Sequence, residues 1–305
     1  MSKVFAETST PPVAGKAVCC VIGPVGDPGT PVRLRADLVF ERIFSPAADH
    51  CGFSAWRADR SVLPGRIPDE VLHHLYDDPV VIADLTGNNG SVAYELAVRD
   101  FYGKPTVAVI DEGQRIPFYQ SQVRVIRISH LTEEAIERSV ASVSASIGDA
   151  VRAAVVADSP FAEAVRLRDT RLSGAEAKGV YLYCVDLDLH RQIRDFLAGH
   201  GVAIVARDER QGRLGGTPAL MREICCQAAA AVVVMRRDAR GQPLSDTDYV
   251  LGAAQAAFGM DRVIAMLEVG AGWQGHLAGY WHGFRRDPLD LSSLRLRLLE
   301  MGLVK

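Results

Sequence analysis

Continuous apolar runs and amphipathic segments alternate along the first half of the chain. The runs "AVCCVIGP" (17–24), "PVVIADL" (79–85) and "PTVAVID" (105–111) are typical of strands that are buried on both faces of a sheet. Between them, "VRLRADLVFERIFSPAADHCG" and "SVAYELAVRDFYG" carry apolar residues at helical spacing, and Gly103 ends the second helix. Strands and helices that alternate over short connections predict a doubly wound, largely parallel sheet.

The remaining segments complete this pattern and then repeat it. "FSAWRAD" (53–59) and "VRVIRI" (123–128) predict two further strands, and Pro68 stands near the start of a predicted helix over 69–75. Thr132 is a suitable N-cap for a helix that extends to about residue 156. Four more apolar runs and three helical patterns follow between residues 179 and 269. We therefore predict a flexible arm over 1–16, a first α/β domain over 17–158, a linker over 159–178 and a second α/β domain over 179–305, both flavodoxin-like or Rossmann-like with parallel sheets.

The two halves resemble each other in sequence. "YELAVRDFYGKPTVAVI" from Tyr94 aligns with "YVLGAAQAAFGMDRVIAML" from Tyr249, with one residue inserted in the second copy. The acids of the first half are replaced in the second, Glu95 by Val250 and Asp84 by Arg236 or Met235. Any two α/β units share some likeness, so chance remains the alternative to a true repeat. A true repeat would mean that the second copy has lost its carboxylates and is a partner or recognition domain.

The composition is that of a globular protein, with 48% hydrophobic and 23% charged residues among 305. A net charge of −3 gives no sign of nucleic-acid binding. No apolar run approaches the roughly 20 residues of a membrane helix, and the first 16 residues lack the apolar core of a signal peptide. We expect a cytoplasmic protein that does not contact a membrane.

The six cysteines follow no metal-site spacing. Two adjacent pairs lie inside apolar segments, and no C-x-x-C motif is present. Zinc sites and disulfide frameworks need other arrangements, so we expect reduced, mostly buried thiols. We predict neither a metal site nor a cofactor.

Three predicted loops reach the carboxyl ends of the strands, where open α/β sheets bind their ligands. They are "GPVGDPGT" after the first strand, "ADR" after the second and "DLTGNNGS" after the third. Their glycines let the backbone approach a ligand closely, and free amides at a helix start favour anionic groups. Such loops are common, and no G-x-G-x-x-G or Walker pattern is present. The candidate substrate-binding residues are Gly23, Pro24, Gly26, Asp59, Asn88, Asn89 and Ser91.

Three acids near these loops are candidates for catalysis. Glu95 lies in the first or second turn of its helix, where the helix dipole is expected to lower the pKa and keep the carboxylate ionised. An ionised carboxylate can act as a nucleophile or stabilise a developing cation, although the position equally suits a capping glutamate. Asp84 ends a buried strand, where an acid is unusual unless it caps the turn. Asp69 is either a third catalytic candidate or an ordinary first-turn helix acid.

The motifs taken in order resemble the nucleoside 2-deoxyribosyltransferase-like superfamily over residues 17–128. The resemblance is carried by "CVIGPVGDPGTPVRLRADLVFERIFSPA", "RAD" and "PGRIPDEVLHHLYDDPVVIADLTGNNGSVAYELAVRDFYGKPTVAVID". It is closest to the branch with a "GP-x-G" opening, an "R-A-D" strand end and an "I-A-D-L-T-x-x-N-x-x-x-x-Y-E-L" core. The second half is faintly similar to TIR-type and other nucleotide-binding α/β domains.

This resemblance implies cleavage of an N-glycosidic bond in a nucleoside or nucleotide, with NAD as a further candidate. It assigns the nucleophile to Glu95, in the Y-E-L motif, which attacks the anomeric carbon and forms a glycosyl-enzyme. It assigns protonation of the leaving base to Asp69 and contact with the sugar or a 5′-phosphate to the loop over 23–29. Asn89 stands six positions before the glutamate, where hydrolases often have serine and transferases aspartate, so neither subclass is matched.

Three classes of function follow from these observations. The first is an N-glycosidase, either a hydrolase or a transferase, that acts on a small-molecule nucleoside or nucleotide. The second is a non-catalytic nucleotide sensor that uses the same pocket, and the third is a structural assembly subunit. The resemblance also implies a homo-oligomer and a role in nucleotide signalling or bacterial antiphage defence.

Overall fold

The computed structural model of the chain describes residues 15–60, 67–121, 123–153, 179–205, 228–235, 245–269 and 281–304. These residues belong to two compact units. One is Met1–Val92 with Lys104–Ala157, and the other is Ala93–Gly103 with Asp158–Lys305. The expected arm, apart from its last two residues, and the whole expected linker over 159–178 lie outside the described residues. The sequence placed Ala93–Gly103 in the first domain, whereas these residues group with the second unit. The expected domain boundaries stay a prediction.

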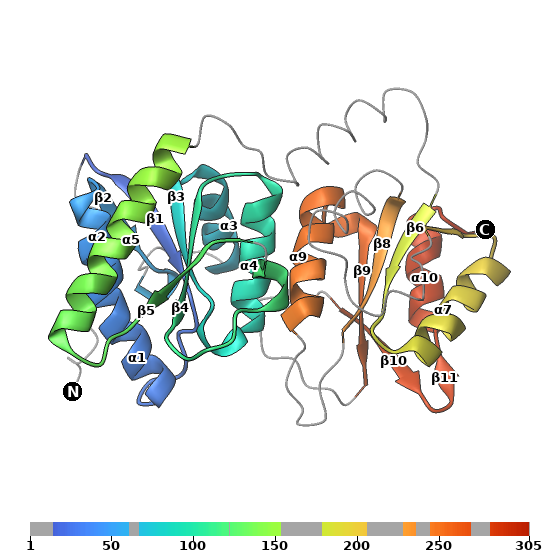
Figure 1. The fold of residues 1–305 in the computed structure, drawn as a ribbon. Coiled ribbons are helices and arrows are strands. Elements are labelled where there is room, and N and C mark those ends of the chain that lie inside the picture. Colours follow the sequence, from blue (N-terminus) through green and yellow to red (C-terminus); the bar gives the residue numbers. More distant parts are fainter. Residues whose placement is uncertain are drawn as a thin grey trace, which may run out of the picture. The chain divides into compact units, whose positions relative to one another are not determined.

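The first unit contains a five-stranded parallel sheet in the flavodoxin-like order β2-β1-β3-β4-β5 (Figure 1). Every neighbouring pair in it is parallel. The predicted doubly wound parallel fold is therefore confirmed. The strands are β1 (Ala17–Ile22), β2 (Phe53–Trp56), β3 (Val80–Asp84), β4 (Thr106–Asp111) and β5 (Val125–Ile128).

Helices cover both faces of this sheet. On one face, α1 (Pro31–Val39), a π-helical turn η1 (Phe40–Phe44), α2 (Ser45–His50) and α5 (Glu133–Ala153) build a continuous apolar core with the strands. On the other face lies α3 (Ile67–Asp77), as Figure 1 shows. Thr132 caps α5 through its side-chain oxygen, which accepts the N–H of Ala135 at 3.2 Å, as predicted.

The single helical pattern over 32–52 contains one irregularity. Between α1 and α2 the backbone forms the π-helical turn, in which the N–H of Ser45 donates to the carbonyl oxygen of Phe40. Pro46 follows directly and has no N–H for the carbonyl four residues earlier. The wider turn adapts the helix to this missing hydrogen bond.

The second unit contains a six-stranded sheet in the order β11-β10-β9-β8-β6-β7. All pairs are parallel except β10 with β11. On one face, α7 and α10 build the apolar core with the strands. The elements are β6 (Gly179–Tyr183), α7 (Leu187–Gly199), β7 (Ala203–Val205), β8 (Ala228–Met235), α9 (Ser245–Phe258), β9 (Val263–Glu268), β10 (Trp281–Arg286), β11 (Leu289–Asp290) and α10 (Ser292–Glu300).

The strand order repeats between the units. Starting from β7, the second sheet has the order β7-β6-β8-β9-β10, which matches β2-β1-β3-β4-β5. In each copy one helix follows the third strand, namely α4 (Gly90–Phe101) with Tyr94 and α9 with Tyr249. Inside the second unit, Tyr94 Oη donates to Gln255 Oε1 at 2.8 Å and Tyr249 Oη to Asp100 Oδ2 at 2.9 Å. Each acceptor stands six positions after the tyrosine of its own helix, which favours a true repeat over chance likeness.

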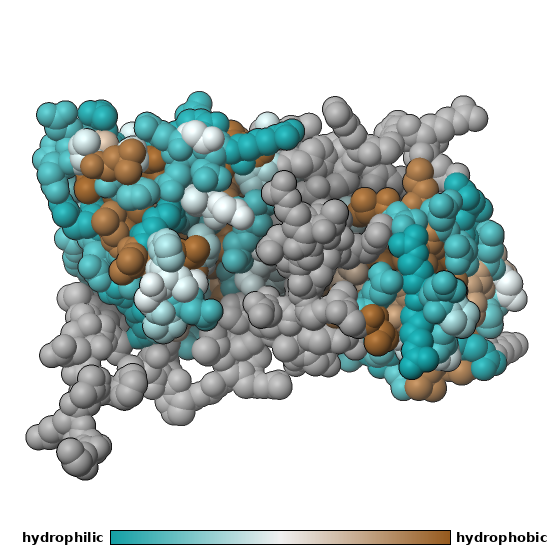
Figure 2. All heavy atoms as spheres, turned by 90° about the horizontal axis from the view of Figure 1, so that it is seen from below, coloured by the Kyte–Doolittle hydropathy of each residue, from teal (hydrophilic) through white to brown (hydrophobic). Residues whose placement is uncertain are grey.

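The elements β10, β11 and α10 were not anticipated from the sequence. Trp281–Phe284 pairs with β9 as a parallel strand although it belongs to a glycine-rich stretch that reads as a loop. Hydrophobic residues also reach the surface in small groups among hydrophilic ones (Figure 2). On α1 these include Leu34, which is 66% exposed. Among the helices in the described part of the chain, none combines the length and apolar character needed to span a bilayer.

Candidate functional site

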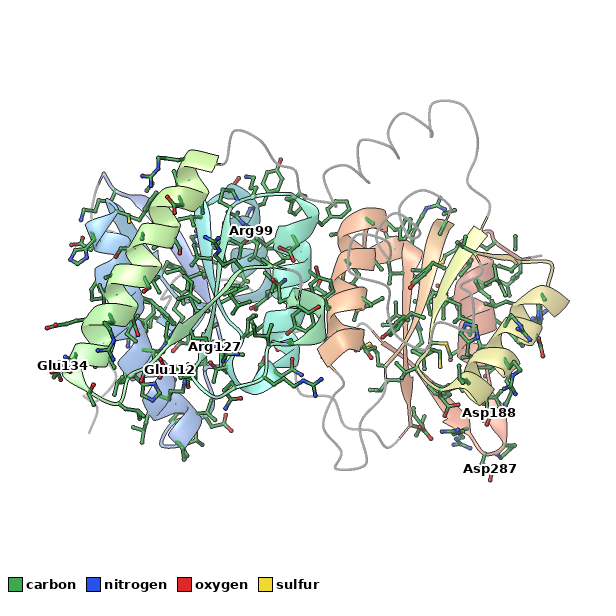
Figure 3. All side chains as sticks on the ribbon, viewed as in Figure 1. Arg99, Glu112, Arg127, Glu134, Asp188 and Asp287 are labelled. Atoms are coloured by element: carbon green, nitrogen blue, oxygen red, sulfur yellow. The ribbon has the colours of Figure 1, made fainter. Side chains whose placement is uncertain are left out.

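The candidate site is the carboxyl edge of the first sheet. Strands β1, β2 and β3 lead there into the predicted loops, and Glu112 and Arg127, labelled in Figure 3, lie at or near the ends of β4 and β5 on this edge. Two clusters of charged side chains occupy the edge, one at the ends of β3 and β4 and one at the end of β2.

Arg35 connects the ends of β3 and β4 through hydrogen bonds and ion pairs. From α1, Arg35 donates through Nε to Asp111 Oδ2 at 2.6 Å and through Nη2 to Asp111 Oδ1 at 2.7 Å. Its Nη1 donates to Asp84 Oδ2 at 2.6 Å, and its Nη2 donates to Thr86 Oγ1 at 2.9 Å. Thr86 Oγ1 also accepts the N–H of Asp111 at 3.0 Å, while the N–H of Thr86 donates to Asp84 Oδ1 at 3.1 Å. We call these four residues the Arg35 cluster.

The Arg35 cluster is largely shielded from water. The side chain of Asp84 is 2% exposed and that of Arg35 is 14% exposed. Burial alone would lower the pKa of Arg35, but the hydrogen bonds and charges of Asp111 and Asp84 outweigh it and raise the pKa above the ordinary arginine value. Asp84, a predicted catalytic residue, thus has both carboxylate oxygens in hydrogen bonds within the protein.

The loop after β1 passes directly over Asp84. A β-carbon on Gly23 would lie 3.1 Å from the β-carbon of Asp84, so this position favours glycine. Pro24 follows and is half-buried. Gly26 has a φ of +67°, and a β-carbon there would meet the Val32 side chain at 2.8 Å. Both glycines therefore serve the close packing of this loop, and contact with a ligand stays a prediction for all three residues.

The loop after β3 folds back on itself before α4 begins. In its 3-10 turn η3 (Thr86–Asn88), Gly87 and Asn88 have φ values of +74° and +52°. Asn88 Oδ1 accepts a hydrogen bond from Tyr119 Oη at 3.3 Å. Asn89 Oδ1 accepts the backbone N–H groups of Ser91 at 2.9 Å and Val92 at 3.2 Å. Asn89 is thus the N-cap of α4, a role that the sequence analysis did not foresee.

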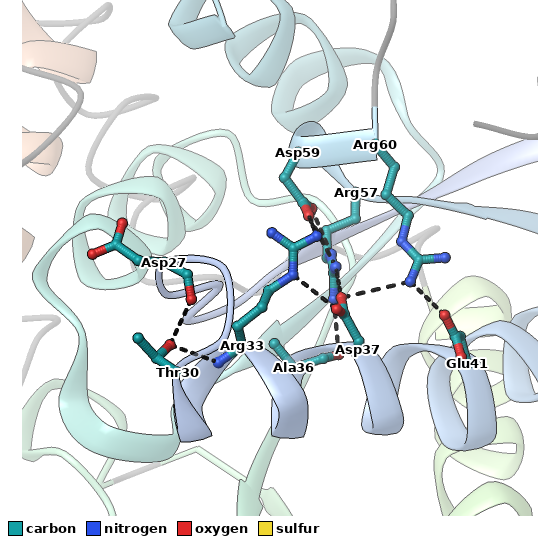
Figure 4. A network of polar contacts seen from close by, with 9 residues as sticks. All are labelled: Asp27, Thr30, Arg33, Ala36, Asp37, Glu41, Arg57, Asp59 and Arg60. Atoms are coloured by element: carbon teal, nitrogen blue, oxygen red, sulfur yellow. Dashed lines mark hydrogen bonds and ion pairs between the residues drawn. The ribbon is translucent and has the colours of Figure 1, made fainter. Parts of the chain in front are cut away.

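A second cluster joins the end of β2 to α1 and η1 (Figure 4). Arg57 follows β2, is 4% exposed, and donates to Asp37 and to the carbonyl oxygen of Ala36. Its Nε also donates at 2.6 Å to Asp59 Oδ1, a predicted substrate-binding residue in the 3-10 turn η2 (Ala58–Arg60). Arg33 reaches Asp59 as well, with an Nη2–Oδ2 distance of 3.1 Å.

The charges of this second cluster balance. Arg60 pairs with Glu41 at 2.6 Å, so three arginines face three carboxylates within hydrogen-bonding or ion-pair distance. The hydrogen bonds from Arg57 and Arg33 lower the pKa of Asp37 below its ordinary value, although burial acts in the opposite direction. The cluster has no surplus positive charge with which to attract a phosphate.

The predicted nucleophile, Glu95, lies in the second turn of α4 and is 8% exposed. Burial raises the pKa of Glu95 to about 8. The expectation that the helix dipole keeps this carboxylate ionised at neutral pH is therefore wrong. The desolvation of a buried carboxylate outweighs the favourable dipole, which acts mainly on exposed groups in the first turn. Glu95 is a mostly neutral carboxylic acid at pH 7.

The third predicted acid lies at the start of α3. Asp69 is the third residue of that helix, as the first-turn interpretation requires, and its side chain lies outside the described residues. Thr86 and Asp111 were not identified from sequence as members of the edge, and the cluster that Arg35 forms with them was not foreseen. The signal available for them was only an arginine in the first helix and a polar residue at or just after the ends of β3 and β4.

The second unit carries a buried acid on its matching helix. Asp248 directly precedes Tyr249 in α9 and is 1% exposed, and neither of its carboxylate oxygens has a hydrogen-bond partner in the described structure. Burial raises the pKa of Asp248 to about 8. Val250 stands at the position aligned with Glu95, so Asp248, two residues earlier, is a separate acid and not the counterpart of Glu95.

Within the described ranges, no three His, Cys, Asp or Glu side chains are grouped in a way that could hold a metal ion. A surface groove is lined by residues of η1, α2 and α5, namely Arg42, His50, Glu133, Ile136, Glu137, Val140, Ala141 and Ser144. Neither feature adds to the candidate site. In comparisons with known proteins, no protein-family model and no curated protein matches this chain.

Proposed function

We propose that this protein cleaves the N-glycosidic bond of a nucleoside, a nucleotide or NAD, with Glu95 as the nucleophile. The observation that carries this proposal is the position of Glu95, a buried acid in the second turn of the helix that follows the third strand of a flavodoxin-like sheet. The ordered motifs that resemble the nucleoside 2-deoxyribosyltransferase-like superfamily require this fold and this position. The resemblance supplies the chemistry, and the fold supports it.

The protonation state of Glu95 is compatible with this chemistry. A carboxylate attacks the anomeric carbon only when it is ionised, and a pKa of about 8 leaves a minor ionised fraction at pH 7. The oxocarbenium-like transition state brings positive charge next to the carboxylate, which favours ionisation. A desolvated carboxylate also stabilises such a cation more strongly than a hydrated one does.

Other residues of the edge take supporting roles in this proposal. Asp69 is the remaining candidate for protonation of the leaving base, because Asp84 is already paired with Arg35. The loop of Gly23, Pro24 and Gly26 lines the sugar. Asn88, Ser91 and Asp59 offer polar groups to its substituents, and Asn89 shapes the pocket as the cap of α4.

Base release tests the proposal directly. The protein is incubated with a panel of ribonucleosides, 2′-deoxyribonucleosides, their 5′-phosphates and NAD, and free base is measured by chromatography. Addition of a second base distinguishes transfer from hydrolysis. Glu95→Gln should abolish release, whereas Glu134→Gln, an exposed change on α5, should leave it unchanged. Release that persists in Glu95→Gln would refute the nucleophile assignment.

Intact-mass measurement tests the covalent step. With a slowly hydrolysed substrate, the wild-type protein should gain the mass of the sugar portion, and Glu95→Gln should not. Peptide mapping should then place the adduct on the segment that contains Glu95.

The alternative function is a nucleotide sensor, and one observation favours it. A neutral buried acid such as Glu95 can bind an uncharged base or sugar by hydrogen bonding without any reaction. A sensor would be stabilised thermally by the ligand in both wild type and Glu95→Gln, with no base released from any compound. The homo-oligomer and the role in defence or signalling remain proposals that rest on the resemblance, and the cytoplasmic location remains a proposal that rests on the sequence pattern alone.

A further inference from the structure

The Arg35 cluster brings together three separate segments of the candidate edge. Arg35 comes from α1, Asp84 and Thr86 come from the end of β3 and the loop after it, and Asp111 ends β4. In sequence, Arg35 is 49 residues from Asp84 and 76 from Asp111. All four side chains are described and lie in the first unit.

We infer that Arg35 is a positioning residue for the candidate site, which sets the path of the loop between β3 and α4 through Asp84 and Thr86. For its effect on catalysis, this inference rests on the proposed function. The inference also means that Asp84 acts by holding Arg35 and Thr86 and not by direct contact with substrate, since the side chain of Asp84 is 2% exposed.

The geometry explains why an arginine is required. A planar guanidinium can pair with one carboxylate through two nitrogens and still direct a third N–H elsewhere. Here Nε and Nη2 bind Asp111, Nη1 binds Asp84, and Nη2 also reaches Thr86. A lysine ammonium is a single point donor on a flexible chain and cannot span both carboxylates and the hydroxyl in this geometry.

The cluster is connected to Glu95 through the chain. Thr86 begins η3, Asn89 caps α4 three residues later, and Glu95 lies six residues after Asn89. The N–H and the Oγ of Thr86 both form hydrogen bonds, which restrain the start of this loop. Loss of Arg35 would leave Asp84 and Asp111 as neighbouring carboxylates without their shared cation, and their repulsion would displace the loop.

The first experiment compares Arg35→Lys, Arg35→Met and Arg35→Ala with the control Arg42→Met. Arg42 is exposed and pairs with Glu133 of α5, on the face of the first sheet that α1 also covers. Base release should fall at least tenfold in kcat for all three Arg35 variants, with a smaller change in KM. Arg42→Met should match the wild type. Wild-type kcat in Arg35→Met would overturn the inference.

Chemical rescue separates positioning from a general loss of stability. Guanidinium ion at millimolar concentration, well below denaturing levels, should restore part of the kcat of Arg35→Ala. Urea, which is neutral and of similar shape, should not restore it at the same concentration. Equal effects of the two solutes, or no effect of either, would contradict a role for the paired guanidinium.

Hydrogen exchange gives a readout that needs no activity. In Arg35→Lys and Arg35→Met, the amides of residues 85–92 should exchange faster than in the wild type, and those of α5 should not. If an Arg35 variant does not fold, the triple change Arg35→Met, Asp84→Asn and Asp111→Asn removes the unpaired charges and takes its place. If the wild type releases no base, the proposed function fails, and unchanged exchange over 85–92 would then still refute the positioning role.

Discussion

A β-carbon on Gly23 would stand 3.1 Å from the β-carbon of Asp84, closer than two side chains pack without adjustment. Asp84 cannot easily move away, because Arg35 and the N–H of Thr86 hold its carboxylate. The loop after β1 can therefore pack closely against the end of β3 only because residue 23 is a glycine and has no side chain.

We predict that Gly23→Ala destabilises the protein by about 1–3 kcal/mol, the usual cost of forcing an extra methyl group into a packed site. Thermal or urea unfolding measures this change. The control is Gly199→Ala, where a β-carbon meets no atom within 4 Å and no loss is expected. If Gly23→Ala is as stable as the wild type, the Arg35 cluster can shift to make room for the methyl group more easily than its hydrogen bonds indicate.

The second prediction concerns the pH dependence of base release. If Glu95 must be ionised to attack, kcat/KM should rise with pH, by about tenfold per unit below the pKa, and level off near pH 8. The direction follows because deprotonation creates the nucleophile. The initial rate at low substrate concentration between pH 5 and 9 tests this, with the stability of the protein checked at each pH. A rate that falls between pH 6 and 8 would mean that Glu95 acts as an acid.

The third prediction concerns stability and Asp248. Its folded pKa of about 8 lies above that of an unfolded aspartic acid, so the folded state holds a proton that the unfolded state releases between about pH 4 and 8. Stability should therefore decrease as pH rises through this window, by up to roughly 6 kcal/mol from this group.

Asp248→Asn should remove this pH-dependent loss and stabilise the protein most at pH 8. Asp188→Asn, an exposed change on α7 that is labelled in Figure 3, should leave the pH dependence unaltered. Urea unfolding at several pH values gives the comparison. Parallel curves for wild type and Asp248→Asn would contradict the burial of a neutral acid at this position.

The fourth prediction separates the capping role of Asn89 from a substrate role. Asn89→Ala removes the acceptor for two N–H groups at the start of α4 and should cost about 1 kcal/mol. Asn89→Asp keeps the acceptor and adds a charge that the helix N-terminus favours, so its stability should equal or exceed that of the wild type. A large change of KM in Asn89→Asp, at unchanged stability, would show that the residue also contacts substrate.

The fifth prediction compares two arginines of the second cluster. Arg57→Met removes the buried guanidinium that Asp37 and Asp59 share and leaves both carboxylates to Arg33, so it should cost about 1–3 kcal/mol. Arg60→Met affects a more exposed pair with Glu41 and should cost less than about 1 kcal/mol. Denaturant unfolding of both variants tests the difference, and equal losses would mean that burial does not set the strength of these pairs.

The local elements were the most predictable part of this structure. Buried strands such as Val80–Asp84 appear as continuous apolar runs, and caps such as Thr132 stand at fixed positions before a helix. The strand β10 could not be foreseen, because its residues acquire a strand pattern only by pairing with β9.

The polar contacts of the site were the least predictable part. The partner of Asp84 is an arginine 49 residues away, and only the folded sheet brings the two together. Glu95 shows the same limit, since its place on the helix indicates a favourable dipole, while the burial that dominates its pKa depends on what surrounds it. Position along a helix can be deduced from sequence, but desolvation cannot.

The central place of β1 has a consequence for synthesis on the ribosome. Its neighbours in the sheet are β2 and β3, so one edge of this cysteine-containing apolar strand stays unpaired until residues 80–84 have left the exit tunnel. The same holds for β6, which lies between β7 and β8. During synthesis, the unpaired edges of β1 and then of β6 are therefore exposed in turn and can pair with other chains. Slower elongation or a shortage of chaperones should lower the yield of native protein.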